Sequence, residues 1–379
     1  MHALHLCMDH NFVTDSRKRF EQYYPGQNTF VVYKQTSELE MIKNPEGFIV
    51  MNLDEKENYA RILQICREKG VDRIVMHGVL GYMLELLEYL KCHIEFKIYW
   101  VFWGYELYEA LTYERNYHSI DDGFSPFHKL YYFIPNKVSK FLRKSFNRYR
   151  APKFVKIFSM ADYFCFWNVR DYELLKRNFE TNAEFRFFSY GANTDDSMPA
   201  DLFELRERTL RNVMIDHQAS VYGNHRTVFR RLRQIDRDNS LNKITPLSYG
   251  HPMIRDRVLA VGRRAFGDKF KPVLDYMSCK EYFKMLDSID VAIFGQRRQE
   301  ASGNIIQLLK NGVKVFLRND NNLLDYYREK GYIIFSFEDD LKDMESMTPL
   351  SLDEQRHNRE VFLANRMYYD DFMPNLFEK

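Results

Sequence analysis

The sequence has little of what marks exported or membrane-spanning chains. Its 379 residues include five cysteines, far apart and without a C-x-x-C pair, so we expect free, mostly buried thiols in a reducing compartment. No apolar run approaches the roughly 18 residues of a membrane span, and Asp9 interrupts the amino-terminal stretch where a signal peptide needs apolar residues. These absences predict a chain with neither an export signal nor a transmembrane anchor.

Two common nucleotide-binding motifs are also missing. No G-x-G-x-x-G follows the first apolar run and no G-x-x-x-x-G-K-[ST] occurs, so redox dinucleotide binding and P-loop phosphoryl transfer lose support. No set of His, Cys and carboxylate residues has the spacing of a metal site, so we expect neither a metal nor another cofactor. The net charge is only +2, so attraction to an anionic partner must come from the local distribution of charge.

The sequence does have short apolar runs that alternate with amphipathic stretches along its whole length. This pattern predicts repeated β-α units, and therefore an α/β fold with parallel sheets. The length suits two domains. A polar stretch rich in turn formers, Gly191–Pro199, marks the transition between them. We place the first domain over 1–195, a linker over 196–210 and the second domain over 211–379, with its last helices able to pack back on the first.

The expected elements follow from this alternation. In the first half we expect strands over 3–8, 29–33, 48–51, 73–76, 96–102, 163–166 and 185–188, and a helix over 58–69 that stops at Gly70. In the second half we expect strands over 212–215, 244–249, 291–294 and 313–317, and helices over 225–235, 254–266, 279–286 and 303–310. Gly312 stands where a left-handed helix cap is expected.

Two loops after predicted strands are candidates for binding a ligand, because ligands collect beyond the carboxyl ends of strands in an open parallel sheet. The first runs from Gln299 to Asn304 into a helix, where backbone N–H groups at Ser302 and Gly303 can approach a diphosphate. Arg297 and Arg298 precede it, and such donors stabilise the charge that develops on a leaving diphosphate. The second loop is Ser220–His225, where helix capping alone explains either Ser220 or Asn224 and is the favoured explanation. Ordinary turns favour similar residues.

A reaction at such a site requires a carboxylate or imidazole that can activate a hydroxyl group. Glu106 is our first candidate, His77 the second and Asp9 the third, because each lies at or just after the end of a predicted strand. A structural salt bridge is the alternative for Glu106. A hydrogen-bonded core imidazole is the alternative for His77.

One segment, 123–158, breaks the α/β pattern. No acidic residue occurs between Asp122 and Asp162, and nine basic residues are interleaved with aromatic ones. This composition suits an anionic membrane surface, single-stranded nucleic acid, or a solvated helix with aromatic core contacts. For a membrane surface, the expected contact residues are Lys137, Lys140, Phe141, Arg143, Lys144 and Phe146.

Several stretches match one known family in order along both halves. They are His77-Gly78, Trp103–Glu109, Ser220 with Asn224-His225, Pro246–Gly250 and the block 292–312 with Arg298-Gln299, Gly303 and Asn311-Gly312. Together they resemble the family of TDP-4-acetamido-4,6-dideoxygalactose:lipid II transferases, the N-acetylfucosamine transferases of enterobacterial common antigen assembly. Three departures stand out: Ser302 lies in Glu-Ala-Ser-Gly rather than Gln-Gly-Ile-Gly, the loop 216–222 is less rich in Gly, Asn and Ser, and Glu106 stands where Asp is usual.

The resemblance implies a GT-B architecture, in which two Rossmann-like domains face each other across a cleft, without a required metal. The first domain would bind a polyprenyl-diphosphate-linked saccharide acceptor. The second would bind a TDP-sugar, with a UDP-sugar as the less favoured alternative. The enzyme would work peripherally on the cytoplasmic face of a bacterial inner membrane, without nucleic acid. The expected donor-binding residues are Ser220, Asn224, His225, Tyr249, Gly250, Arg298, Gln299, Ser302, Gly303, Asn304 and Asn319.

Two other functions fit part of the pattern. A nucleotide-sugar epimerase can share the two-domain architecture and would need no acceptor. A non-enzymatic module that binds membranes or nucleic acid would use the basic segment alone.

Overall fold

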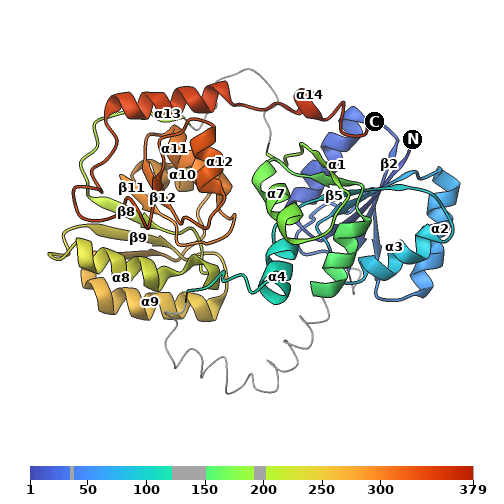
Figure 1. The fold of residues 1–379 in the computed structure, drawn as a ribbon, viewed down its shortest axis with the longest axis horizontal. Helices are drawn as coiled ribbons and strands as arrows, with labels where there is room; N and C mark the ends of the chain where they lie inside the picture. The colour runs from blue at the N-terminus through green and yellow to red at the C-terminus, as the bar shows by residue number, and fades with distance from the viewer. Residues whose placement is uncertain (35–37, 122–150, 192–201, 379) are drawn as a thin grey trace, which may run out of the picture. The chain divides into compact units, whose positions relative to one another are not determined.

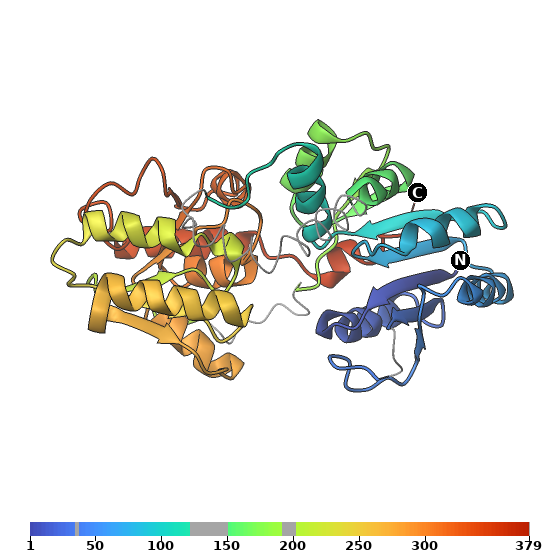
Figure 2. The same ribbon diagram turned by 90° about the horizontal axis from the view of Figure 1, so that it is seen from below.

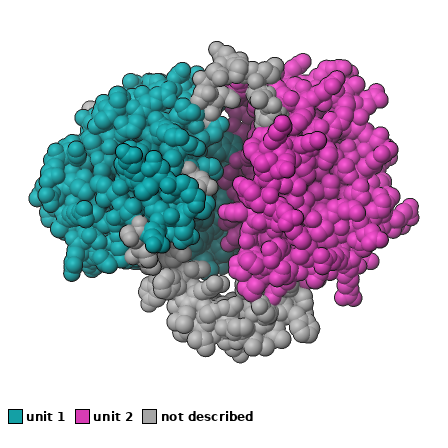
Figure 3. Space-filling view, turned by 180° about the vertical axis from the view of Figure 1, so that it is seen from behind, with its two compact units in different colours: residues 1–117, 137–195, 367–379 teal, residues 118–136, 196–366 magenta. Residues whose placement is uncertain are grey.

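A computed structural model describes residues 1–34, 38–121, 151–191 and 202–378, and these form two compact units. Of the described residues, unit 1 contains 1–34, 38–117, 151–191 and 367–378, and unit 2 contains 118–121 and 202–366 (Figure 3). Each unit is therefore assembled from separate stretches of the chain. In particular, residues 367–378 belong to the same unit as the amino-terminal strands.

Unit 1 is built on a seven-stranded parallel sheet with the order β3-β2-β1-β4-β5-β6-β7. Its strands are β1 Ala3–Met8, β2 Asn28–Tyr33, β3 Phe48–Met51, β4 Arg73–His77, β5 Lys97–Val101, β6 Tyr163–Cys165 and β7 Glu184–Arg186. Its helices are α1 Asn11–Tyr23, α2 Glu57–Lys69, α3 Met83–Lys91, α4 Tyr105–Glu114, α7 Val169–Asn178 and α14 Tyr369–Phe372, and residues 151–160 are also helical.

The two faces of this sheet bury different sets of side chains. Leu4 and Leu6 of β1 pack in a core with α2, α3, α4 and α7, whereas Ala3 and Cys7 pack in a second core with α1 and α14. The alternation is that of any strand buried on both sides, whose successive side chains point to opposite faces. Phe377 closes the second core against Phe20 and Tyr99.

Unit 2 contains a six-stranded parallel sheet with the order β10-β9-β8-β11-β12-β13. Its strands are β8 Asn212–Ile215, β9 Asn242–Pro246, β10 Phe270–Val273, β11 Val291–Ile293, β12 Lys314–Leu317 and β13 Phe335–Ser336. Its helices are α8 His225–Ile235, α9 Pro252–Phe266, α10 Cys279–Asp287, α11 Ser302–Lys310, α12 Leu323–Glu329 and α13 Leu352–Ala364. Helices α8 and α9 lie side by side on one face, and α10 to α13 lie on the other (Figures 1 and 2).

Most predicted elements are confirmed. The strands over 3–8, 48–51 and 212–215 and the helix over 225–235 have the predicted bounds, and Gly70 and Gly312 have the left-handed φ values of 64° and 75°. The strand expected over 244–249 instead runs Asn242–Pro246, so Tyr249 lies in the following loop. The edge strands β10 and β13 were not predicted; β10 contains Pro272, which strands tolerate only at a sheet edge.

The predicted membrane contacts at Lys137, Lys140, Phe141, Arg143, Lys144 and Phe146 lie outside the described residues. At the described end of that basic segment, Lys153 and Lys156 pair with Glu85 and Glu88 of α3. These two cations therefore contact acidic side chains within unit 1. In the described part of the chain, no helix combines the length and the apolar character that crossing a membrane requires.

Candidate functional site

The order of the strands indicates where a ligand binds in each unit. In unit 2 the chain moves from β8 outward to β9 in one direction and to β11 in the other, so a crevice is expected at the carboxyl ends of β8 and β11. The loops that follow these strands begin at Asp216 and Phe294. In unit 1 the corresponding point lies between β1 and β4, where Asp9 and Gly78 follow the strands.

Unit 2 has an open groove of about 650 Å³ at the carboxyl edge of its sheet, within the size range of small-molecule sites. The loops after β8 and β9 form its walls, with Gln218–Tyr222 on one side and Ser248–Pro252 on the other. Tyr249 is 67% exposed in this groove. Three predicted donor-binding residues, Ser220, Tyr249 and Gly250, therefore line the same groove.

Backbone contacts hold these two loops together. The Ala219 N–H donates to the Tyr249 carbonyl over 2.8 Å, and the His251 N–H donates to the Ala219 carbonyl over 2.9 Å. Gly250 adopts a φ of 108°, and a Cβ atom there would lie 2.5 Å from the Ala219 carbonyl oxygen. Only glycine fits this turn without displacing the opposite loop.

The loop after β11 approaches the loop after β8 just as closely. A Cβ atom at Gly295 would lie 2.1 Å from the Gly223 carbonyl oxygen, and one at Gly223 would lie 2.3 Å from Asp216 Oδ2. Asp216 itself has a φ of 60° and is fully buried. The three loops after β8, β9 and β11 therefore form one packed rim along the groove.

Buried polar atoms without partners collect in this rim. Asp216 Oδ1 accepts hydrogen bonds from the His217 N–H over 2.6 Å and from Gln296 Nε2 over 2.7 Å. Among the described residues, Asp216 Oδ2, Gln296 Oε1 and Glu300 Oε2 have no hydrogen-bond partner. Burial raises the pKa of the Asp216 carboxyl, but the hydrogen bond from His217 and the nearby His225 outweigh it and lower the pKa. Unpaired buried acceptors of this kind are where a water or ligand donor is expected.

Arg298 places a cation beside the groove. Its guanidinium lies 3.7 Å from the ring centroid of Tyr222, a lining residue, and its NH2 group donates to Glu300 Oε1 over 2.7 Å. Gln218 Nε2 approaches the same Glu300 oxygen at 3.5 Å. The structure thus brings the predicted Arg298 to the groove wall, paired with a carboxylate that the sequence did not single out.

Helix α11 begins next to this cluster. Ala301 precedes it with a φ of 64°, and Ser302, Gly303 and Asn304 form its first turn, whose N–H groups have no partner within the helix. No heavy atom lies within 4 Å of a Cβ atom built on Gly303. Gln299 lies in the preceding loop, half-buried. The first turn of α11 is thus open enough for an anion to reach its backbone.

Two predicted donor-binding residues are engaged elsewhere. Asn224 Nδ2 donates to the Gly295 carbonyl over 2.9 Å, and its Oδ1 accepts from the Asp121 N–H over 2.9 Å. Asn319 Nδ2 donates to Asp339 over 2.7 Å, and its Oδ1 accepts from the Ser336 hydroxyl. Both amides connect loops within unit 2, which is a structural role.

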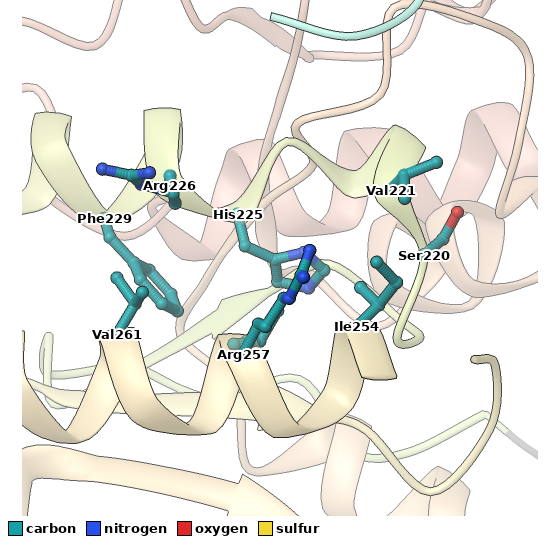
Figure 4. Close-up of a pocket in the computed structure, with 9 residues that line it drawn as sticks. Ser220, Val221, His225, Arg226, Phe229, Ile254, Arg257 and Val261 are labelled. Carbon is teal, nitrogen blue, oxygen red and sulfur yellow. The ribbon is translucent and has the colours of Figure 1, made fainter. Parts of the chain in front are cut away.

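His225 is buried between helices α8 and α9. It borders a small cavity of about 30 Å³ with Phe229, Ile254 and Arg257 (Figure 4). Burial lowers the pKa of its imidazole, and Nε2 has no partner among the described residues. Ser220 and Ile254 line both this cavity and the larger groove, so His225 lies behind the groove wall.

In unit 1, His77 belongs to a buried chain of hydrogen bonds. Its Nδ1 lies 2.6 Å from the Tyr190 hydroxyl, and its Nε2 lies 3.1 Å from His5 Nδ1. The chain ends at Asn28 on one side and at Trp103, whose Nε1–H donates to the Tyr190 oxygen over 3.0 Å, on the other. Burial lowers the pKa of His77 to about 3, so the imidazole is neutral at physiological pH.

Glu106 is fully buried in the first turn of α4. Its Oε1 accepts from Trp100 Nε1 over 2.9 Å and from the Trp103 N–H over 3.1 Å, while Oε2 has no partner in the described part of the chain. Burial raises the pKa of this carboxyl to about 7. The predicted first-choice base is thus a carboxyl group that changes charge near neutral pH, inside the core.

Asp9 holds a loop. Its carboxylate accepts hydrogen bonds from the backbone N–H groups of Glu40, Met41 and Ile42 and pairs with Lys34 at 3.2 Å. Burial raises its pKa, but these bonds outweigh that effect and lower it. Every oxygen of Asp9 is therefore engaged in fixing the residues after Leu39, which explains its position without a catalytic role.

His10 is a candidate that the sequence reasoning missed, although it directly follows Asp9. Its ring lies 4.8 Å from that of Trp103, and burial lowers the pKa of its imidazole. It is only partly buried, unlike His5 and His77. Its position just after the first strand was the signal that could have identified it.

No group of three or more His, Cys, Asp or Glu side chains that could hold a metal ion occurs within the described residues. The carboxylates of Asp9, Glu106, Asp216 and Glu300 are instead bonded to backbone N–H groups, a lysine, a tryptophan, a glutamine or an arginine. The rim of unit 2 offers backbone amides, an arginine and unpaired acceptors. Such a set can bind a polar, anionic small molecule.

No family model and no curated protein matches this chain. Solved structures do match, at low sequence identity. Sucrose-phosphate synthase from Thermosynechococcus elongatus aligns over 98% of this chain and 96% of its own, with a TM-score of 0.63 and 8% identity. Alr3699/HepE of Anabaena, solved in complex with UDP, aligns over 98% and 97%, with a TM-score of 0.61 and 10% identity.

WaaG, a glycosyltransferase involved in lipopolysaccharide biosynthesis, aligns over 99% of this chain and all of its own, with a TM-score of 0.59 and 12% identity. These proteins are GT-B glycosyltransferases, and the similarity extends over both units. The chain therefore has the GT-B fold, as the sequence predicted.

Proposed function

We propose that the chain is a glycosyltransferase that takes a sugar from a nucleotide-activated donor. The observation that carries this proposal is the groove at the carboxyl edge of the unit 2 sheet in a GT-B fold, lined by Ser220, Tyr222 and Tyr249. The structure of HepE with UDP and that of a trehalose-6-phosphate enzyme of E. coli with UDP-2-fluoro glucose support a nucleotide-sugar ligand.

The finer identity of the substrates rests on the sequence resemblance. The stretches Trp103–Glu109 and 292–312 support a 4-acetamido-4,6-dideoxyhexose as the donor sugar, carried on TDP, with UDP as the less favoured alternative. The same resemblance supports a polyprenyl-diphosphate-linked saccharide as the acceptor. Under this proposal the enzyme works at the anionic cytoplasmic surface of a bacterial inner membrane, in the synthesis of a surface polysaccharide.

In the proposed reaction, an acceptor hydroxyl oxygen forms a bond to C1 of the donor sugar. The bond between C1 and the diphosphate oxygen breaks, and the nucleoside diphosphate leaves with the electron pair. The backbone at Ser302 and Gly303 and the Arg298 guanidinium stabilise the charge that it gains. The acceptor proton passes to a base, for which the partly exposed His10 is better placed than the fully buried His77.

Incubating the purified chain with TDP-, UDP- and GDP-sugars, with and without lipid-linked saccharide, tests the proposal by mass spectrometry of the products. We expect acceptor-dependent transfer from the TDP-linked amino sugar. Altered sugar formed from the donor alone would indicate an epimerase, and no product from any donor would contradict an enzymatic role.

The same assay tests the base. We expect His10→Ala to lower turnover by about 100-fold, within the range for loss of a general base. His77→Gln should lower turnover only to the extent that it lowers the stability of the fold. Glu106→Gln should lower turnover by less than His10→Ala does. Equal turnover of wild type and His10→Ala at saturating donor would exclude the imidazole of His10 as the base.

A further inference from the structure

A short stretch of chain, 118–121, supplies unit 2 with an internal carboxylate at the carboxyl ends of β11 and β12. Asp121 Oδ1 accepts from Arg297 Nε over 2.6 Å, and Asp121 Oδ2 accepts from Arg318 NH1 over 2.8 Å. The Arg318 side chain is only 4% exposed and that of Asp121 13%. Two guanidinium groups thus converge on a single carboxylate at a largely buried position.

The backbone of this stretch is held as well. The Asp121 N–H donates to Asn224 Oδ1, and Asn224 Nδ2 donates to the Ser119 carbonyl over 3.3 Å and to the Gly295 carbonyl over 2.9 Å. Asn224 lies two residues after the groove loop Gln218–Tyr222, and Gly295 lies in the loop after β11. The stretch is therefore attached to the same rim of loops that borders the groove.

Arg297 and Arg318 have the features of a phosphate site. Arg318 is the first residue after β12 and Arg297 follows β11, so both lie where anionic ligands bind in an open parallel sheet. Paired guanidinium groups are the usual partners of phosphate oxygens. Asp121, Asp320 and Glu338 give this cluster one more carboxylate than arginines, so an incoming anion is repelled while Asp121 remains in place. Displacement of Asp121 leaves two carboxylates against the two arginines and removes that excess negative charge.

We infer that Arg297 and Arg318 form a phosphate subsite for the donor, which Asp121 occupies until a diphosphate displaces it. The inference rests on the proposed function, because it assigns part of the same donor site. It makes Asp121 a competitor of the donor. Asn224 is then a positioning residue, which holds the competing segment.

Titration calorimetry with inorganic pyrophosphate and with TDP tests the inference on wild type, Asp121→Asn and Asp320→Asn. Removing the competing charge should tighten binding about ten-fold in Asp121→Asn, since charge-assisted bonds to phosphate replace those to the carboxylate. Asp320 is the matched control, because it pairs with the same Arg297 but its side chain is 46% exposed. Its replacement should change affinity by less than about two-fold, because exposed pairs are screened by solvent.

Unchanged or weaker binding by a folded Asp121→Asn, or equal tightening in both variants, would overturn the inference. A second measurement, on wild type alone, tests the inference even if Asp121→Asn does not fold. Pyrophosphate should speed hydrogen exchange of the amides at 119–121, since displacement breaks the Asp121 to Asn224 bond; slower or unchanged exchange would overturn it. If wild type and variants bind neither ligand, the proposed function fails too, whereas binding without tightening defeats only this inference.

Discussion

The buried imidazoles of unit 1 carry their protons on nitrogens that their neighbours determine. Asn28 Nδ2 donates to the Tyr24 carbonyl over 2.6 Å, so its Oδ1 accepts from His5 Nε2. His5 Nδ1 must then accept from His77 Nε2, and His77 Nδ1 must accept from the Tyr190 hydroxyl. This order leaves the Tyr190 oxygen to accept from Trp103. The orientation of the Trp103 ring therefore depends on Asn28 through three intervening residues, His5, His77 and Tyr190.

The carboxyl of Glu106 should make stability depend on pH. Its pKa is about 7 in the folded chain against 4.5 as the ordinary value, because burial disfavours the charged form, so its contribution to stability is lost as pH rises from about 4.5 to 7. Glu106→Gln keeps the shape of the neutral acid. Wild type should therefore lose about 3 kcal/mol of unfolding free energy, relative to Glu106→Gln, when the pH is raised from 4.5 to 8.

Urea unfolding at both pH values measures this difference, and Glu114→Gln, exposed at the end of the same helix, is the control. A difference between wild type and Glu106→Gln that does not change with pH would contradict the assignment.

At the level of single residues, the sequence indicated positions better than roles. Glu106, His77 and Asp9 were chosen because they lie at or just after the ends of predicted strands. His77 ends β4 and Asp9 directly follows β1, whereas Glu106 lies in the first turn of α4. Their contacts depend on residues distant in the chain: His77 on Tyr190, and Asp9 on the amides at 40–42. Such partners follow from the packing of the sheet, which spacing alone does not specify. His10 was not predicted, because Asp9, the first residue after the same strand, was selected as the candidate there.

Among the elements, helix α11 offers a direct test of the diphosphate site. Gly303→Ala should raise the free energy of unfolding by about 0.5–1 kcal/mol, because alanine is the better helix former and nothing lies within 4 Å of its Cβ. If the backbone there contacts the diphosphate, the added methyl group should nevertheless weaken TDP binding about ten-fold, a cost of about 1.4 kcal/mol.

Calorimetry on Gly303→Ala and Gly262→Ala separates the two effects. A Cβ atom at Gly262 in α9 would lie 2.4 Å from the Phe270 ring, so that variant should lose stability and keep its affinity for TDP. Unchanged TDP affinity in Gly303→Ala would remove this helix terminus from the proposed site.

The elements that the sequence predicted well share strong local signals. The helix over 225–235 carries apolar residues on one face, and β1 alternates between two cores. Strand β13 has only two residues, and β10 contains a proline, so neither has a pattern long enough to be detected. The groove was predicted only as a set of loops, because the Ala219 to Gly250 bridge that shapes it joins residues 31 apart along the chain.

At the scale of the whole molecule, unit 1 should depend on residues 367–378. Tyr369, Phe372, Met373, Leu376 and Phe377 are all buried in its second core. Fully burying one such side chain stabilises a fold by about 1.5–3 kcal/mol. The loss of all five is therefore comparable to the whole free energy of unfolding of a typical domain, about 5–15 kcal/mol. Deleting 367–379 should therefore unfold unit 1 and leave unit 2 folded.

Scanning calorimetry checks this expectation, because TDP should raise only the unfolding temperature of the unit that binds it. Leu376→Ala, which truncates a buried side chain, should lower the transition temperature of unit 1. Asn375→Ala, at the exposed neighbouring residue, should leave that temperature unchanged. A deletion variant that retains two transitions would contradict the assignment of this segment to the core.

The same arrangement constrains how the chain matures as it is made. A ribosome releases β1 and α1 hundreds of residues before Phe377, which closes the face that they form. That apolar face stays uncovered while all of unit 2 is translated, and domains of a nascent chain otherwise tend to fold in order from the amino terminus. Unit 2 is thus the first part of this protein able to complete its fold, and a pause in translation late in the message prolongs the interval in which chaperones must shield the earlier half.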